Sequence, residues 1–162
     1  MDNNSINIDI EQRAARGVEL FKQGYNCAQA VALAFADVYA GRISRDTLAA
    51  MAASMGGGMG RLRLTCGAVT GMALLAGLEN GPSEPGNMPE RTANYAIVQQ
   101  LAAEFKAEND SLICAELLGL RAGTVEPPRP SERTAAYYKA RPCAKMVECA
   151  CRIYARHLAE RQ

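Results

Sequence analysis

The amino-acid sequence predicts an all-α fold, a single-domain bundle of about seven helices around a buried central helix. Apolar residues recur at intervals of three and four along most of the chain, and segments with the alternation of a β-strand are almost absent. The 162 residues are enough for one hydrophobic core and too few for two independent domains. We therefore assign residues 1–162 to one all-helical domain.

Capping residues and glycines bound the predicted helices. Asp9 is an N-cap residue ahead of the first apolar stripe, and Gly41 ends the second helix. Met51 and Tyr95 fall on stripes that we expect to face inward. The helices are predicted over residues 10–23, 26–39, 44–55, 65–78, 90–106, 112–118 and 143–158, with long loops at 80–89 and 120–131.

The segment from Thr65 to Leu78 is the predicted central helix, because nearly all its residues are apolar or small. It falls short of the roughly 20 residues needed to span a bilayer, so we expect a buried helix and no membrane insertion. Gly67 and Gly71 lie four residues apart on one face. Glycines inside a helix cost about 1 kcal/mol relative to alanine, which indicates close packing or room for a bound group there.

Composition and charge narrow the class of protein. The formal net charge is +1 and the charged residues are spread along the chain, so no nucleic-acid partner is predicted. The N-terminus from Met1 to Ser5 is polar and has no secretory signal, which predicts a cytoplasmic protein. Thiols are kept reduced in the cytoplasm, so the six cysteines read as metal ligands, redox centres or small buried hydrophobes rather than structural disulfides.

Four of the six cysteines stand where a helix is predicted to begin. A helix N-terminus carries about half a positive charge and lowers the pKa of a thiol placed there, which favours the thiolate that binds metals and attacks disulfides. Burial in apolar surroundings acts in the opposite direction, and for Cys66 the sequence leaves the balance open. The four are Cys27 after Asn26, Cys66 after Thr65, Cys114 after Ser111, and Cys143 after Pro142.

The remaining cysteines and the one histidine are assigned structural roles. Cys149 and Cys151 lie about 200° apart on a helix, so both cannot face one site, and we expect them to pack in the core. His157 lies in the last turns of the final helix, where a cation suits the helix dipole. We expect His157 at the surface.

The glycine cluster at residues 56–60 precedes Arg61 and could cradle an anion with its backbone N–H groups. It lacks the Lys-Ser/Thr ending of a P-loop, so nucleotide binding is a weak hypothesis. Our preferred interpretation is that the cluster lets the chain pass close to the Cys66 helix, with Arg61 and Arg63 offsetting thiolate charge. The residues predicted to contact a cofactor are Gly58, Gly60, Arg61, Gly67 and Gly71.

Several motifs in this order resemble one family. They are GYNCAQAV at residues 24–31, GGGMGR at 56–61, CGAVTG at 66–71, Cys114 ahead of Leu117-Leu118-Gly119, and Cys143. The chain resembles the C_GCAxxG_C_C family of redox-active proteins, which have four cysteines at positions matching Cys27, Cys66, Cys114 and Cys143. The family is similar to the cysteine-bearing part of split-Soret cytochromes, in which four cysteines hold an iron–sulfur cluster. The resemblance therefore implies a cluster or metal role, and not haem, since the C-x-x-C-H pattern is absent.

We expect a redox-active protein with a site made of the four cysteines, which bind an iron–sulfur cluster or another metal. Four thiolates and a core of two ferric ions and two sulfides leave a negative charge that four helix N-termini, at about +0.5 each, can offset. Two alternatives stay open: dithiol/disulfide exchange without a metal, and a non-catalytic helical assembly protein whose cysteines only pack. A redox partner protein and a homodimer are also expected, the latter because 49% of the residues are apolar.

Overall fold

The computed structural model describes residues 6–162 and is all-helical over that range, which confirms the predicted fold class. The only β geometry within this range is an isolated bridge between Thr65 and Ile113. No helix among these residues is both long and apolar enough to cross a membrane. The nine helices of the described chain are α1 (Ile10–Lys22), α2 (Cys27–Leu33), α3 (Arg45–Ala53), α4 (Gly56–Met59), α5 (Gly67–Asn80), α6 (Met88–Asn109), α7 (Cys114–Leu117), α8 (Ala135–Ala140) and α9 (Cys143–Ala159).

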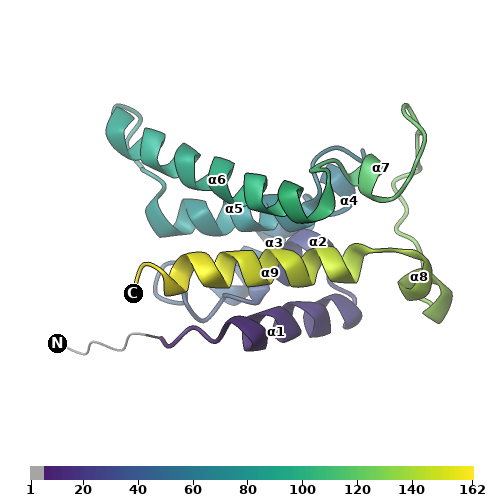
Figure 1. Cartoon of the computed structure of the whole chain (residues 1–162), viewed down its shortest axis with the longest axis horizontal. Coiled ribbons are helices and arrows are strands. Elements are labelled where there is room, and N and C mark those ends of the chain that lie inside the picture. The colour runs from purple at the N-terminus through teal and green to yellow at the C-terminus, as the bar shows by residue number, and fades with distance from the viewer. Residues whose placement is uncertain (1–5) are drawn as a thin grey trace.

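The long helices form a layered bundle, and the short helices α4, α7 and α8 lie at one end of it (Figure 1). Helix α9 packs along α1 and also contacts α2, α5 and α6, while α2 packs against α5 and α3. Helix α5 buries one face, including Met72 and Leu75, but Gly77 on it is exposed. The core is therefore shared by α1, α2, α3, α5, α6 and α9 and is not built around the 65–78 helix alone.

Helix α2 ends at Leu33, so the prediction of a helix reaching Tyr39 was wrong. The carbonyl oxygen of Ala34 accepts a hydrogen bond of 2.8 Å from Nη1 of Arg13. The N–H of Val38 donates instead to Phe35, three residues back, as in a tight turn. Arg13 is only 4% exposed and also pairs with Asp37. Its buried guanidinium therefore satisfies the carbonyl group that would otherwise accept a hydrogen bond from the next turn of the helix.

The crossing of α2 and α5 depends on glycine. A Cβ atom at Gly71 would lie 2.9 Å from the Cβ of Val31, and one at Gly67 would lie 3.1 Å from the Cβ of Cys27. Both distances are tighter than ordinary van der Waals contact. The predicted close approach is confirmed, and at Gly67 it brings the start of α5 against the start of α2.

Three predicted positions differ in the structure. Met51 is 50% exposed and Tyr95 is 58% exposed, so their inward assignments were wrong. His157 is 8% exposed, and its Nε2 lies 2.7 Å from Oε2 of Glu79, so its surface assignment was also wrong. The acid that pairs with His157 comes from α5, and spacing along α9 could not reveal it.

Candidate functional site

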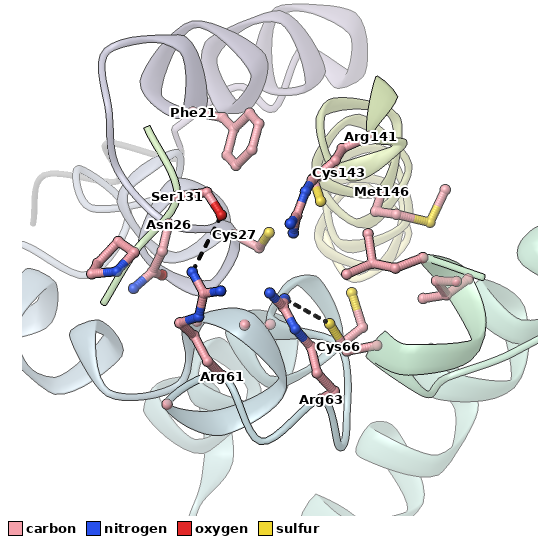
Figure 2. A pocket seen from close by; sticks show the side chains of 18 of the residues that line it. Phe21, Asn26, Cys27, Arg61, Arg63, Cys66, Ser131, Arg141, Cys143 and Met146 are labelled. Atoms are coloured by element: carbon pink, nitrogen blue, oxygen red, sulfur yellow. Dashed lines mark hydrogen bonds between the residues drawn. The ribbon is translucent and has the colours of Figure 1, made fainter. Parts of the chain in front are cut away.

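A cavity of about 340 Å³ lies at the end of the bundle where α2, α5, α7 and α9 begin. Figure 2 shows Cys27, Cys66 and Cys143 around it, together with several arginines. Cys149 and Cys151 are not among the residues that line it. The structure thus brings together the four cysteines singled out by sequence, which are Cys27, Cys66, Cys114 and Cys143.

The four cysteines do begin helices, although the caps differ from the prediction. Cys27, Cys114 and Cys143 are first helical residues, whereas Cys66 is itself an N-cap. Asn26 caps α2 as predicted, with a reciprocal capping box to Gln29. The N-cap of α7 is Ile113 and that of α9 is Pro142, so neither of these helices has a side-chain cap.

Backbone pairing holds Cys66 beside Cys114. The N–H of Cys66 donates to the carbonyl of Leu112 over 2.8 Å, and the N–H of Cys114 donates to the carbonyl of Leu64 over 2.6 Å. A Cβ atom at Gly58 would lie 2.7 Å from the Cβ of Cys114, so only glycine fits there. Segments 50 residues apart in sequence are therefore fixed against each other by main-chain contacts, which no local pattern predicts.

The glycine-rich segment has an unusual backbone. Residues 57–61 all have φ between 57° and 70°, and Met59, Arg61 and Arg63 are non-glycine residues in this left-handed region. Such conformations cost about 1–3 kcal/mol each and persist where the surroundings enforce them. This turn directs Arg61 and Arg63 into the lining of the cavity, as expected from their proximity to Cys66.

Cys27 and Cys143 lie close enough for each thiol to shift the pKa of the other. The hydrogen bond from Cys27 lowers the pKa of Cys143 to about 7, and the nearby guanidinium groups of Arg141 and Arg63 add to this effect against the opposing effect of burial. The same contact, together with burial, raises the pKa of Cys27 well above its usual value. The pair therefore favours a thiolate on Cys143 and a thiol on Cys27.

The other two cavity thiols are held in their neutral form. Burial raises the pKa of Cys66 to about 12, although the N–H groups of Ala68 and Val69 act in the opposite direction. Burial also raises the pKa of Cys114, against a hydrogen bond from Arg63. Desolvation therefore outweighs the helix N-terminus at Cys66, where the sequence left the balance open, and at Cys114, where the expected preference for the thiolate was wrong. At Cys27 that expectation was also wrong, chiefly because of the hydrogen bond with Cys143.

Four arginines line the cavity, and two of them were missed by the sequence analysis. Arg133 donates to the carbonyl oxygens of Phe21 and Tyr25 at 3.0 and 3.1 Å. Arg141 lies two residues before Cys143, a proximity that could have signalled its role. Both follow a loop that the sequence marks only as a surface excursion. The four are Arg61, Arg63, Arg133 and Arg141.

The predicted cofactor contacts divide into two groups. Gly60, Arg61 and Gly67 line the cavity. Gly58 and Gly71 are not among the lining residues; they serve as close contacts with Cys114 and with Val31 of α2.

The sulfurs do not form a site for a single metal ion. Among residues 6–162, no group of three or more His, Cys, Asp or Glu side chains is arranged to hold one ion, and all six cysteines are free thiols. The sulfurs instead belong to a cavity wall that also contains arginine side chains.

The fold and the cavity together define a helical-bundle protein with four free cysteines around one cationic cavity. The chain belongs to the family described as "Putative redox-active protein (C_GCAxxG_C_C)", whose model matches residues 25–157. This match confirms the resemblance inferred from the motifs, and the matched range includes all four cavity cysteines. No curated protein and no solved structure matches the chain.

Proposed function

We propose that the four-cysteine cavity binds an iron–sulfur cluster and that the redox activity of the protein resides there. One observation carries the proposal: four cysteines from four separate elements line a single cavity together with four arginines. Thiolates are the ligands that iron–sulfur clusters take, commonly four to a cluster.

The arrangement of the sulfurs suits a cluster better than a single ion. The ligands of one tetrahedral ion must converge on a point, within about 2.3 Å of it for zinc and sulfur. A cluster is several atoms across, so its ligands surround it. Cysteines spread around a cavity of about 340 Å³, with no group arranged for one ion in the described chain, fit the second pattern.

The charge of the cavity also suits an anionic group. Four thiolates and a core of two ferric ions and two sulfides carry a net charge of about −2. The lining holds four arginines and no carboxylate, and Glu126 behind it pairs with Arg61 and Arg63. Arg63 contacts Cys114 directly, with Nη1 3.6 Å from Sγ, and there it can stabilise thiolate charge.

The apolar part of the wall limits water. Phe21, Leu117 and Met146 line the cavity beside the cysteines. Solvent access and hydrogen bonds to sulfur are two of the factors by which a protein sets the reduction potential of a bound cluster. A bound cluster would supply one-electron transfer. The cluster would be held by Cys27, Cys66, Cys114 and Cys143.

Anaerobic purification or reconstitution with iron and sulfide tests the proposal. We expect stoichiometric iron and acid-labile sulfide and visible absorption in the wild type, all lost in Cys66→Ser. Cys149→Ala is the matched control, because the Cys149 thiol contacts Glu108 and Asn109 away from the cavity. Absence of iron and sulfide from the wild type, or equal loss in both variants, would refute cluster binding.

Dithiol/disulfide exchange is the second candidate, favoured by the direct contact between Cys27 and Cys143. The Cys143 thiolate would attack a substrate disulfide, forming a mixed disulfide and releasing one substrate thiolate. Cys27 would then lose its proton and attack the Cys143 sulfur, closing the Cys27–Cys143 disulfide and releasing the second substrate thiolate. Peptide mass mapping after treatment with a disulfide should find this bridge and no other if exchange is the function.

We place this chemistry in the cytoplasm, where thiols are kept reduced. A partner protein that exchanges electrons with the site, and a homodimer, stay predictions. Size measurement in solution and cross-linking to candidate electron carriers would test them.

A further inference from the structure

We propose that the cavity contains an anion subsite, with Arg141 as its main ligand and Arg61 as its second, for the carboxylate of a small organic molecule. The inference goes beyond cluster binding and does not depend on it. It starts from the hydrogen-bond partners of the four cavity arginines, two of which are each held by several protein groups.

Arg63 and Arg133 each have several protein partners. Arg63 donates from Nε to Oε2 of Glu126 over 2.5 Å and from Nη1 to the Cys114 sulfur. Arg133 donates from both terminal nitrogens to backbone carbonyls. Both guanidinium groups are therefore held in place by protein partners.

Arg141 and Arg61 retain free donors. Within residues 6–162 the guanidinium of Arg141 has no hydrogen bond and no ion pair, and it is held against the ring of Tyr137 at 5.1 Å from the ring centroid. Arg61 uses its terminal nitrogens for Ser131 and Glu126 at 3.3 Å each, while its Nε is buried without a partner in the same part of the chain. In Figure 2 both guanidinium groups point toward the cavity, from opposite walls.

An anion satisfies these donors. Arg61 Nε is such a buried donor in the described part of the chain, and an unpaired donor of a charged group is unfavourable. The planar guanidinium matches the two oxygens of a carboxylate, which can accept two parallel hydrogen bonds from it. The lining contains no carboxylate of its own that could do so.

The shape and the walls of the cavity set the class of ligand. About 340 Å³ is at the small end of the range for ligand pockets, which excludes a large cofactor beside the cysteines. Phe21, Tyr137 and Pro130 offer apolar surface to the rest of the molecule. A carboxylate bound by Arg141 would hold such a molecule next to Cys143, which lies two residues further along the chain and also lines the cavity.

Two disulfides of similar size, anionic dithiodipropionate and neutral hydroxyethyl disulfide, provide the test. Each reacts with a thiolate to form a mixed disulfide and to release its other half as a thiolate. The ratio of the two rates at Cys143 in reduced, metal-free protein, divided by the ratio for a free thiol, reports anion selectivity. A change in thiolate fraction affects both rates equally and cancels.

We expect Arg141→Gln to lower this selectivity at least about fivefold, on the scale of a hydrogen bond to a charged group, and Arg141→Lys to lower it less. Arg129→Gln, at an exposed position of the neighbouring loop and outside the lining, is the matched control and should leave it unchanged. Equal selectivity in Arg141→Gln and wild type would overturn the inference.

A second measurement needs no variant. Thiodipropionate is a dicarboxylate that cannot exchange, and at constant ionic strength it should slow the reaction of wild-type Cys143 with the neutral disulfide, whereas neutral thiodiethanol should not. Equal effects of the two would also overturn the inference. Because both experiments use metal-free protein, their outcome is separate from that of the iron and sulfide analysis.

Discussion

Nη1 of Arg63 lies 3.6 Å from Sγ of Cys114, and the same guanidinium is paired with Glu126. Arg63 is buried and has a left-handed backbone, so the glycine-rich turn, a cavity cysteine and the loop at 120–131 are joined through one side chain. The electrostatics of the cavity and the position of its covering loop are therefore coupled.

Arg63→Gln should raise the pKa of Cys114 further and loosen the 120–131 loop. Arg63 opposes the effect of burial on that thiol, and Glu126 would keep only Arg61 as its ion-pair partner. Alkylation rate against pH measures the first effect, and limited proteolysis within the loop measures the second. Arg152→Gln, which removes exposed pairs with Glu11 and Glu148, is the control; equal loop cleavage in both variants would contradict the coupling.

A variant that retains only Cys66 should react with alkylating reagents as a buried thiol. Burial raises its pKa to about 12, so the rate midpoint should lie well above the free-thiol value of about 8.5. The rate should therefore stay low through neutral pH and rise only in alkaline solution. A midpoint below the free value would mean that the N–H groups of α5 outweigh desolvation after all.

Gly17→Ala should destabilise the protein through its contact with Cys151. An added Cβ would lie 2.4 Å from the Cys151 sulfur and 3.2 Å from Cγ1 of Val147, and overpacking of this kind costs about 1–3 kcal/mol. Cys151→Ala alone should cost about 1–2 kcal/mol by opening a cavity.

The double variant should lose less stability than the two single variants lose in total, since the new methyl group occupies the space that the sulfur leaves. Urea unfolding of the four proteins measures this coupling. Strict additivity would show that the two residues do not share that space. Neither change should alter iron or sulfide content, because Cys151 lies outside the cavity lining.

Glu79 should contribute stability that acid removes. Burial raises the pKa of Glu79, but its hydrogen bond with His157 and the nearby Arg161 outweigh burial and hold the pKa below its ordinary value. The contribution is therefore present above the unfolded-state value of about 4.3 and is lost as the pH falls through the lower folded-state value.

Urea unfolding of Glu79→Gln at pH 7 and pH 3 tests this contribution. The variant should be less stable than wild type at neutral pH, and the difference should shrink in acid. Glu84→Gln, at an exposed loop position, is the control and should match wild type at both values. A difference for Glu79→Gln that is independent of pH would mean that the carboxylate charge contributes nothing.

Local signals predicted much of the helical framework. Asp9, Asn26 and Ser44 cap helices as expected, because a short polar side chain there satisfies free backbone N–H groups whatever lies nearby. The early end of α2 was not predictable, since it depends on Arg13 from another helix. The same holds for His157, whose partner Glu79 comes from α5.

The sequence by itself determined the helical class, the close packing at Gly67 and Gly71, and which four cysteines belong together, since all of these follow from spacing, capping and motif order. Only the tertiary structure decided that the four thiols share one cavity, that Arg133 and Arg141 join them, and that Cys66 is held neutral while Cys143 favours the thiolate. The physical reason is that the pKa of a thiol depends on desolvation and on charges supplied by distant segments. A helix start at Cys66 is a local property, but the burial that outweighs it is created by packing.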